Sequence, residues 1–504
     1  MNPHFRRDEY PREHNLQRAY ARLDHIEADE ASKYLLLAFD LVDAQWLDTQ
    51  GQQDPLLNLE SPFKRSLAWK KWREQKQLQP HNPFESMPMY RLELEVPRGK
   101  GFFGLPTLPD QRQRSSFLAA AGDLEKSWFE LEISRQHKAG HDSASLYPGM
   151  FADPVRVYVK GKMPSPKTGK ALSGIFSLAN LPQLSMTDFE AELSNTNADL
   201  LAVYDVGQGN ANAILSASRF GEPGVPTLYY DLGAGVYRNK RTTPNPLVFC
   251  FTEKPTIVLS HWDADHWAGA YAFAAHGAYP ALKRTWIAPF QIVGPVHVAF
   301  AHEVLAKGGK FFTYCVPAGL VGVAPLRHGR QVRFTLGNGP DRNGTGIVMA
   351  VEATTHPSPR SWLLTGDCDY QYFVDVLDPL PPVGMVVPHH GADLDPNTPV
   401  PKPPTDSIYR RLVYSFGHDN KHGKSNVQHP TILGMSIHNS ADWDHQHWNL
   451  LAPGWPSPGG DVLATCEHSP GSSRGGALVG WDKPPFLYVA PCGGLQCSTT
   501  LTQG

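Results

Sequence analysis

The chain has 504 residues, which is long enough for two or three domains that each bury a hydrophobic core. Its 41% hydrophobic and 19% charged residues are typical of a globular protein and exclude a disordered or fibrous one. The formal net charge of -3 excludes a globally basic surface, so any contact with nucleic acid would require a local basic patch.

The N-terminal stretch, MNPHFRRDEYPREH, is charged and leads into no apolar run, which argues against a secretory signal peptide. No segment approaches the roughly 18 apolar residues of a membrane helix. The six cysteines are too few for a disulfide scaffold, although Cys492 and Cys497 are close enough in sequence to pair. We therefore expect a cytoplasmic protein with reduced thiols and no membrane contact.

Residues 1–195 are predicted to form an N-terminal α+β domain. Apolar positions at helical spacing between residues 14 and 48 predict one or two helices. Alternating strands are expected at residues 90–96, 128–133 and 155–159. The segment SLAWKKWREQK, which contains Trp69 and Trp72, is compatible with a nucleic-acid contact or with an amphipathic helix whose tryptophans face the core. The domain has no cluster of potential ligands, and binding of a protein partner is one role open to it.

A polar linker at residues 194–197 leads into a second domain at residues 198–450, followed by a C-terminal extension at residues 451–504 that is expected to pack on it. The second domain begins with a strand, the turn DVGQGNA, a second strand and a third strand that ends in DLG. Gly207 and Gly209 allow a tight turn that brings backbone N–H groups near a site. Asp205 is placed to orient a metal-binding histidine.

The segment TIVLSHWDADHWAG, residues 256–269, holds the densest group of potential metal ligands. A buried strand is followed at once by His261, Asp263, Asp265 and His266, at the strand end where open α/β sheets place their sites. On an extended backbone, alternate side chains point the same way, so His261 and Asp263 lie on one side. The turn that follows can present Asp265 and His266 to a second ion. Two neighbouring cations are therefore expected.

Three later segments each end a predicted strand in polar side chains. Residues 362–367 end in Asp367, and residues 385–391 contain the pair His389 and His390. Residues 413–417 form the last expected core strand and lead into a polar loop. The polar residues of that loop include Asn420, Lys421, His422, Lys424, Asn426 and His429. We expect these strand ends to converge at one edge of the sheets.

These motifs resemble the metal-binding signature of the metallo-β-lactamase fold. In particular, D-V-G-Q-G-N-A, a strand ending in D-x-G and H-x-D-x-D-H are similar to the soluble domain of ComEC-type competence proteins and its free-standing relatives. The resemblance covers about residues 198–435 and implies an α/β protein with an αββα sandwich. Asp263 stands where the usual pattern has a second histidine, and Asn210 stands where the family commonly has aspartate. The membrane channel of the competence proteins has no counterpart, so transport is not implied.

The resemblance also implies roles for individual residues. The metal ligands it implies are His261, Asp263, Asp265, His266, Asp367 and His390, with Asp367 bridging two cations. The catalytic residues it implies are Asp205, Asp265 and His429, with His422 as the alternative to His429. The suggested substrate contacts are His389, Asn420, Lys421 and Lys424. Asn426 is the alternative to Asn420. A ligand that many members place between His266 and Asp367 is not identified, and residues 442–447, DWDHQH, fit either an additional metal cluster or a covering loop.

Carboxylate and imidazole ligands without thiolate favour zinc or manganese, and magnesium is also compatible. Two cations about 3.5–4 Å apart would activate a bridging hydroxide and stabilise the attacking and leaving oxygens of a phosphodiester. We therefore predict a metal-dependent hydrolase, a phosphodiesterase or nuclease that acts on DNA. Two alternatives stay open, a small-molecule hydrolase that cleaves a cyclic nucleotide or a lactone, and a non-catalytic binding protein that retains the fold.

Overall fold

The computed structural model divides the chain into two units. The first comprises Met1–Pro182, Phe290–Phe311 and His422–Val427, and the second comprises Gln183–Pro289, Phe312–Lys421 and Gln428–Gly504. The described residues are 1–7, 16–27, 33–75, 80–103, 105–109, 114–217, 224–274, 278–422, 428–446, 448, 460–467, 475–485 and 501–504. The first unit therefore includes a segment from the middle of the chain, residues 290–311, which no linker composition in the sequence predicts.

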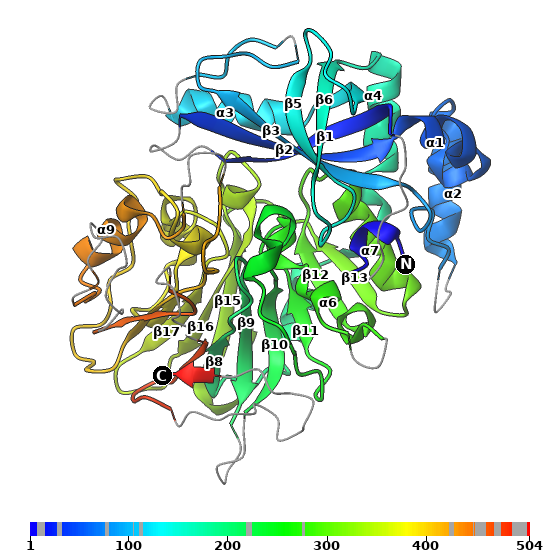
Figure 1. Cartoon of the computed structure of the whole chain (residues 1–504). Helices are drawn as coiled ribbons and strands as arrows, with labels where there is room; N and C mark the ends of the chain where they lie inside the picture. The colour runs from blue at the N-terminus through cyan, green and yellow to red at the C-terminus, as the bar shows by residue number, and fades with distance from the viewer. Residues whose placement is uncertain are drawn as a thin grey trace. The chain divides into compact units, whose positions relative to one another are not determined.

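The first unit is built on a closed barrel of six antiparallel strands, drawn in blue to cyan in Figure 1. In barrel order the strands are β1 (Arg18–Glu27), β2 (Tyr34–Asp43), β3 (Met89–Pro97), β5 (Asp142–Tyr147), β6 (Val155–Lys162) and β4 (Trp128–Ser134). Phe39, Phe103 and Phe129 meet in the interior with ring centroids 5.5–5.9 Å apart. A Cβ at Gly161 would lie 2.4 Å from the Phe103 ring, so this position needs glycine.

The predicted α+β domain, with one or two helices over residues 14–48, is wrong. Most of the described residues in this range form β1 and β2 instead, with a short helix only from residue 44 onward, and the whole barrel closes on itself. Most positions on both faces of these two strands are buried, so the alternation that marks a half-buried strand is lost from the sequence. β1, for example, turns Leu23 into the barrel core and buries Asp24 on its other side. The strands predicted at residues 90–96, 128–133 and 155–159 are confirmed as β3, β4 and β6.

Helices of the first unit accompany the barrel. Those described are α1 (Ala44–Thr49), α2 (Pro62–Glu74), α3 (Arg114–Glu125), α4 (Pro166–Ile175) and α7 (Pro295–Ala306), with 3-10 turns at Pro3–Phe5, Gln50–Gln53, Pro55–Leu57 and Leu178–Asn180. In α2, Ser61 caps the first turn, and Trp69 and Trp72 are only 2% and 7% exposed. Residues 66–74 of the stretch SLAWKKWREQK thus lie in a helix that turns its tryptophans inward, where they are not available to stack on a base.

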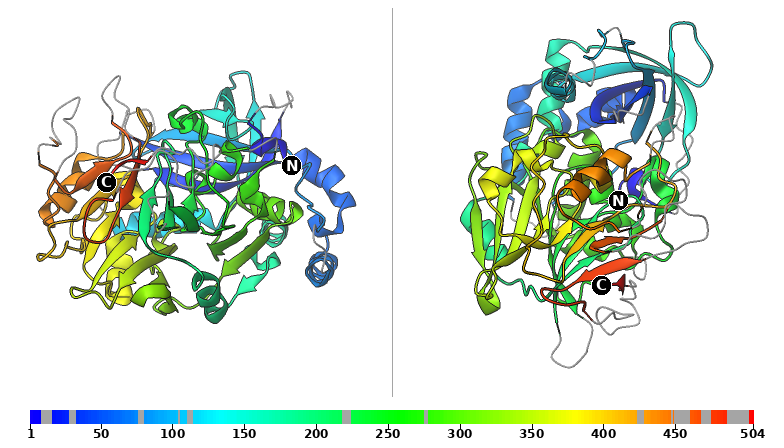
Figure 2. Two further views of the ribbon diagram at one scale, coloured as in Figure 1. Left: turned by 90° about the horizontal axis from the view of Figure 1, so that it is seen from below. Right: turned by 90° about the vertical axis from the view of Figure 1, so that its left-hand side faces the viewer.

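The second unit contains two mixed sheets, which are green and yellow-green to orange in Figure 2. The nine-stranded sheet has the order β22 (Leu501–Gln503), β21 (Gly476–Val479), β8 (Leu200–Val203), β9 (Ala211–Ser216), β10 (Val225–Leu232), β11 (Thr256–Val258), β12 (Thr285–Pro289), β13 (Lys310–Tyr314) and β7 (Gln183–Leu184). The seven-stranded sheet has the order β14 (Gly322–Pro325), β15 (Arg330–Leu336), β16 (Ile347–Ala353), β17 (Arg360–Leu364), β18 (Pro382–Val386), β19 (Arg411–Tyr414) and β20 (Val462–Ala464). One buried core, which includes Val258, Ile287, Met349 and Leu364, draws side chains from both sheets.

The predicted fold class, an αββα sandwich beside an α+β domain, is wrong. The chain forms a closed antiparallel barrel and two mixed sheets. The α-helices described in the second unit are α5 (Met186–Leu193), α6 (Gly269–Ala272), α8 (Val374–Leu377) and α9 (Ile432–Ser440). They have only four to nine residues, and most other helical segments are 3-10 turns, so they are too short to form two helical layers. α7, which has 12 residues and lies between strands of the second unit in sequence, belongs to the first unit.

Residues beyond 450 contribute strands to both sheets of the second unit. β20 is the edge of the seven-stranded sheet, and β21 pairs with β8 of the nine-stranded one. Trp481 stacks on Trp362 with ring centroids 3.8 Å apart. Cys492 and Cys497, which the sequence suggested could pair, lie outside the described residues.

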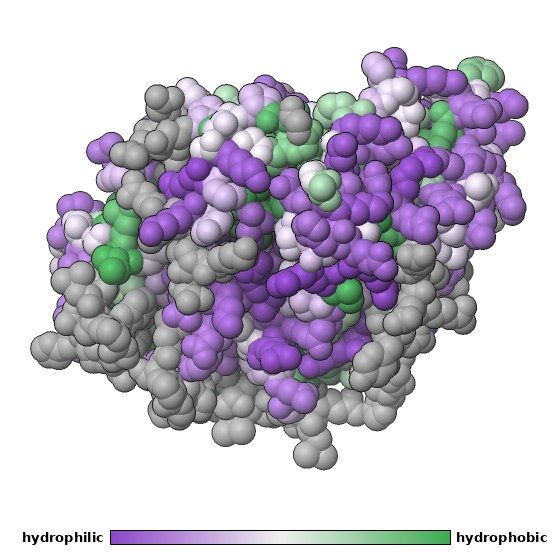
Figure 3. Space-filling model, turned by 45° about the horizontal axis from the view of Figure 1, so that its top comes forward, coloured by the Kyte–Doolittle hydropathy of each residue, from purple (hydrophilic) through white to green (hydrophobic). Residues whose placement is uncertain are grey.

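The described surface is mainly polar on the face shown in Figure 3, where hydrophobic side chains appear as separate patches. Exposed apolar residues of the described chain include Phe63, Ile408 and Ile432. Within the part of the chain that the structure describes, no helix combines the length and the apolar character needed to cross a membrane.

Candidate metal centre

The candidate site lies where loops leave parallel strands of the second unit. His261 and Asp265 follow β11, Asp367 follows β17, and His390 follows β18. β11 pairs in parallel with β10, and β18 pairs in parallel with β17 and β19. Parallel pairing puts the carboxyl ends of neighbouring strands of one sheet at the same edge. The two sheets share a buried core that includes Val258 of β11 and Leu364 of β17, so the strand ends of the two sheets meet here.

Two overlapping groups of side chains have ligand atoms within 4.8 Å of one another. The first is His261, His266 and Asp367, and the second is Asp265, His266 and His390. Nε2 of His266 lies 3.1 Å from Oδ1 of Asp367, and Nε2 of His390 lies 3.3 Å from Oδ2 of Asp265. The structure thus brings together five of the six ligands that the sequence suggested.

A hydrogen bond at Nδ1 orients each imidazole of the centre. His266 donates from Nδ1 to Oδ2 of Asp231 at 2.8 Å, and His390 donates from Nδ1 to the carbonyl oxygen of Ser415 at 2.8 Å. A proton on Nδ1 leaves the lone pair on Nε2, the atom that faces the carboxylates. Metal-binding histidines are held in this way by acceptors behind them.

Ser260 connects His261 to the same support. Its hydroxyl donates to Oδ2 of Asp231 at 2.8 Å and accepts from Nδ1 of His261 at 3.0 Å, while its backbone N–H donates to Oδ1 of Asp231 at 2.7 Å. Asp231 is fully buried and has a φ of 62°, a backbone conformation that aspartate tolerates better than most residues. From the sequence, Asp231 was placed only at a strand end. The D-x-G motif to which it belongs was the feature that could have indicated its supporting role.

The residues present fit a bound cation. Nε2 of His261, His266 and His390 and Oδ1 of Asp367 are buried, and no described residue gives them a hydrogen bond of good geometry. Each buried polar atom without such a bond costs about 1–3 kcal/mol, and metal coordination removes that cost. Together with Asp265, the donors are three imidazoles and two carboxylates, a set that suits zinc or manganese.

The electrostatics of the centre favour positive charge between the imidazoles and carboxylates. Burial alone would lower the pKa of His266, but the carboxylates of Asp367 and Asp231 outweigh burial and raise this pKa well above its usual range. Burial also tends to lower the pKa of His390, but Asp265 outweighs burial and raises this pKa. The imidazoles in turn hold the pKa of Asp367 well below its usual range and lower that of Asp265, in both cases against burial. The same field that stabilises a protonated imidazole stabilises a divalent cation.

The glycine motifs of the second unit make room for the backbone of Asp265. A Cβ at Gly233 would lie 1.9 Å from the carbonyl oxygen of Asp265, and one at Gly209 would lie 2.5 Å from it. The backbone N–H of Asn210 donates to this carbonyl at 3.2 Å, and the carbonyl of Asn210 accepts from Gly233 at 2.8 Å. The turn DVGQGNA therefore holds a candidate ligand through its backbone.

The two neighbouring histidines after β18 have strained backbones. His389 and His390 lie in the 3-10 turn Pro388–Gly391 with φ of 51° and 55°. A left-handed backbone costs about 1–2 kcal/mol per residue, so the surrounding structure must hold it in place. The turn directs His390 toward Asp265, whereas Nε2 of His389 lies 3.9 Å from Oδ2 of Asp367. The His389 side chain is 20% exposed and that of His390 only 3%. The division between a substrate contact and a ligand stays a prediction.

Asp263, the sixth suggested ligand, has a different environment. Its Oδ1 lies 3.1 Å from Nε of Arg342, and its Oδ2 lies 3.6 Å from Nε2 of His261. Arg342 is buried and comes from the glycine-rich loop after β15. Sequence reasoning missed this arginine, because a single basic residue in a loop gives no local signal. Asp263 stands beside the two ligand groups, with one oxygen turned to the arginine.

Asp205 does not occupy the place that the sequence suggested for it. Its Oδ1 accepts a hydrogen bond from the backbone N–H of Gly207 at 3.1 Å, which closes the turn after β8. Burial raises the pKa of Asp205 to about 6. The carboxylate that orients His266 is that of Asp231 instead.

His429 is fully buried and is held by Asn420. The Asn420 amide donates to the carbonyl of His429 at 2.7 Å and accepts from its backbone N–H at 2.9 Å. The His429 ring packs beside that of His389, with centroids 5.5 Å apart. Asn420 is itself fully buried, so its geometry is that of a positioning residue.

Other suggested residues are less informative. Lys421 is exposed. Three suggested residues, Lys424, Asn426 and His447, lie outside the described residues. In the DWDHQH segment, His445 donates from Nδ1 to the carbonyl of Trp443, and its Nε2 lies 3.1 Å from the Tyr414 hydroxyl. These bonds use both ring nitrogens of His445 in packing.

Comparison with known proteins adds no family to this picture. No protein-family model matches the chain, and no curated protein is significantly similar to it. The argument for function therefore rests on the geometry of the centre.

Proposed function

We propose that the second unit is a metal-dependent hydrolase with two divalent cations, and that it cleaves phosphodiester bonds in DNA. The observation that carries the proposal is the orientation of three imidazoles. His261, His266 and His390 are each held at Nδ1 and turn Nε2 toward Asp265 and Asp367 in one buried cluster. These three Nε2 atoms are buried without hydrogen bonds of good geometry, and coordination of a cation would satisfy them.

The two ligand groups suggest how two cations would be shared. His261 and Asp367 would hold one, and Asp265 and His390 would hold the other. Because one Nε2 atom binds one cation, His266 completes only one of the groups, and the other needs the second oxygen of Asp367 or water. This sharing supports a bridging role for Asp367.

Two bound cations would supply a nucleophilic water near neutral pH and neutralise charge on the attacking and leaving oxygens. Asp231 would keep His266 in the binding tautomer, and Arg342 would limit the negative charge of Asp263. His389 stands at the exposed side of the centre with His429 beside it. Either imidazole is placed to bind a phosphate oxygen or to donate a proton to the leaving oxygen.

The proposal is tested by measuring metal content and hydrolysis together. The full chain is stripped with EDTA, reloaded with Mn²⁺, Zn²⁺ or Mg²⁺, and assayed on bis-p-nitrophenyl phosphate, single-stranded DNA, duplex DNA and RNA. We expect metal-dependent cleavage of DNA, and its loss in Asp265→Ala. The matched pair His390→Ala and His389→Ala separates a ligand from its neighbour, because only the former should release metal.

The outcomes separate the alternative functions. Less than one metal per chain, or full activity of Asp265→Ala, would refute the proposed centre. Cleavage of only the small diester, or of a cyclic nucleotide or lactone offered in parallel, would indicate a small-molecule hydrolase. Bound metal without cleavage of any substrate would indicate a binding protein.

A further inference from the structure

The first unit has a basic groove on the outside of its barrel. The groove has a volume of about 880 Å³ and is lined by residues of β1, β4 and β6, which are neighbours in barrel order. Its charged lining residues are Arg18, Glu130, Glu132, Arg135, Lys138, Lys160 and Lys162. Five of these seven side chains are basic, although Arg18 also pairs with Asp48 outside the lining, and the whole chain has a net charge of -3.

Strand β6 gives this surface a regular row of basic and aromatic side chains. Val157 and Val159 are buried in the barrel core, so the alternate residues of the strand face outward. The outward residues are Arg156, Tyr158, Lys160 and Lys162. Tyr158 is half-buried and pairs with Ser143 on β5 and Ser134 on β4. Its ring also packs edge-on against that of His137, with centroids 5.1 Å apart, so a stacking base would use the remaining exposed part of the ring.

The basic groups of the row are available to a ligand. Lys162 lies 3.4 Å from Glu130, and Lys138 lies 2.7 Å from Glu132, but both pairs are at the surface, where such interactions are weak. Arg156 and Lys160 are exposed and make no ion pair with any residue that the structure describes. A chain of phosphates would therefore meet uncompensated positive charge along β6.

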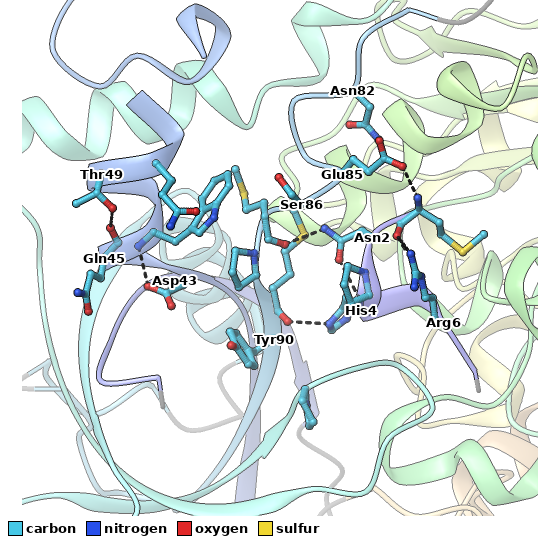
Figure 4. Close-up of a pocket in the computed structure, with 18 of the residues that line it drawn as sticks. Asn2, His4, Arg6, Asp43, Gln45, Thr49, Asn82, Glu85, Ser86 and Tyr90 are labelled. Carbon is cyan, nitrogen blue, oxygen red and sulfur yellow. Dashed lines mark hydrogen bonds and ion pairs between the residues drawn. The ribbon is translucent and has the colours of Figure 1, made fainter. Parts of the chain in front are cut away.

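Two other features of the first unit lack this combination. Helix α2 carries lysines, but its tryptophans are buried. The cavity in Figure 4, about 930 Å³, has a polar lining whose groups bond to one another. There Asn2 donates to backbone carbonyls, Arg6 donates to the carbonyl of Met1, and Glu85 pairs with the N-terminal amine.

We infer that the outward face of β6 and the groove beside it bind single-stranded DNA. Lys160, Lys162 and Arg156 would contact phosphates, and Tyr158 would stack on a base. The choice of DNA among polyanions rests on the proposed function. The surface provides the local basic patch that the net charge of the chain does not.

The test measures binding without hydrolysis. A labelled oligothymidylate is titrated with the full chain in EDTA at several salt concentrations, and binding is followed by fluorescence anisotropy. Lys160→Gln with Lys162→Gln should weaken binding at least about tenfold and reduce the slope of log K against log salt by about 1.4. The matched control, Lys70→Gln with Lys71→Gln on α2, removes the same charge and should leave affinity unchanged.

Tyr158 provides the second arm of the test. Tyr158→Ala should weaken binding about tenfold, whereas Tyr158→Phe, which keeps the ring, should bind like the unmodified chain. Three results would each overturn the inference. They are an equal loss of DNA affinity in the two double lysine variants, unchanged DNA binding by Tyr158→Ala, and tighter binding of heparin than of DNA. DNA binding in EDTA without metal-dependent cleavage would support the surface and refute the nuclease. Cleavage of bis-p-nitrophenyl phosphate without DNA binding would do the reverse.

Discussion

Each unit of the protein contains a buried cluster of aspartate and histidine, and the two clusters hold their imidazoles differently. In the first unit, His297 of α7 lies between two carboxylates, with Nδ1 3.1 Å from Oδ2 of Asp40 and Nε2 3.4 Å from Oδ1 of Asp24. Arg91 pairs with Asp24 and lies 3.9 Å from Oδ1 of Asp40. In the second unit, each imidazole uses Nδ1 for an acceptor behind it and keeps Nε2 for the cluster.

The difference fits an ion-pair network in the first unit and the proposed metal centre in the second. The ligand atoms of both clusters are close enough together to hold a cation. In the barrel, however, a guanidinium and an imidazole already lie against the two carboxylates, and His297 connects α7 to β1 and β2. Burial and the neighbouring Asp24 raise the pKa of Asp40, as expected for carboxylates crowded in a dry site. Composition alone would have treated the two clusters alike.

The largest effect is expected from His266→Ala, because His266 belongs to both ligand groups. Loss of a residue that only supports a ligand lowers metal affinity by about 10–100-fold, so loss of this ligand should lower hydrolysis by more than about 1,000-fold. Metal analysis should show fewer cations per chain. His297→Ala is the matched control in the other cluster, and equal metal loss in both variants would contradict the comparison.

His297→Ala should instead lower stability. Removing the imidazole leaves the buried carboxyl groups of Asp24 and Asp40 without this partner, and breaking a buried pair costs about 3–5 kcal/mol. Urea unfolding followed by tryptophan fluorescence measures the change. Retained stability, or loss of bound metal from the folded variant, would show that the barrel cluster is not a structural network.

Asp205→Asn tests whether the carboxylate of Asp205 belongs to the metal centre. The pKa of Asp205 is about 6 in the fold and about 3.9 in an unfolded chain, so ionisation costs stability as the pH rises through this window. In EDTA, we expect the free energy of unfolding of Asp205→Asn to exceed that of the unmodified chain by up to about 3 kcal/mol at pH 7. The two values should be equal near pH 3. Loss of metal from this variant would restore the orienting role suggested by the sequence.

The smallest effect is expected from Asp231→Asn. This change keeps an oxygen for Ser260 but removes the negative charge behind His266. Metal affinity should fall by about 10–100-fold, as for other supporting carboxylates, while the fold persists. Competition with a fluorescent zinc chelator measures the change, and unaltered affinity would show that Nδ1 orientation does not matter here.

Part of the candidate centre was already evident in the sequence. The segments that end in His266, Asp367 and His390 each show a short apolar run followed by ligand-type side chains, and both features are local. The strands β3, β4 and β6 were found for the same reason, because one face of each is polar. That these residues bind metal stays a prediction until cations are measured.

Other features were decided only by tertiary structure. β1 and β2 look helical in sequence because the structure buries both of their faces, and α7 joins a barrel more than a hundred residues earlier in the chain. The acceptors that orient the imidazoles, Asp231 and Ser415, come from other strands, and Arg342 comes from a loop without a recognisable motif. Local patterns report which residue types are present at a strand end. Which atom of an imidazole is left for a metal depends on partners that only the packed sheets bring within hydrogen-bonding distance.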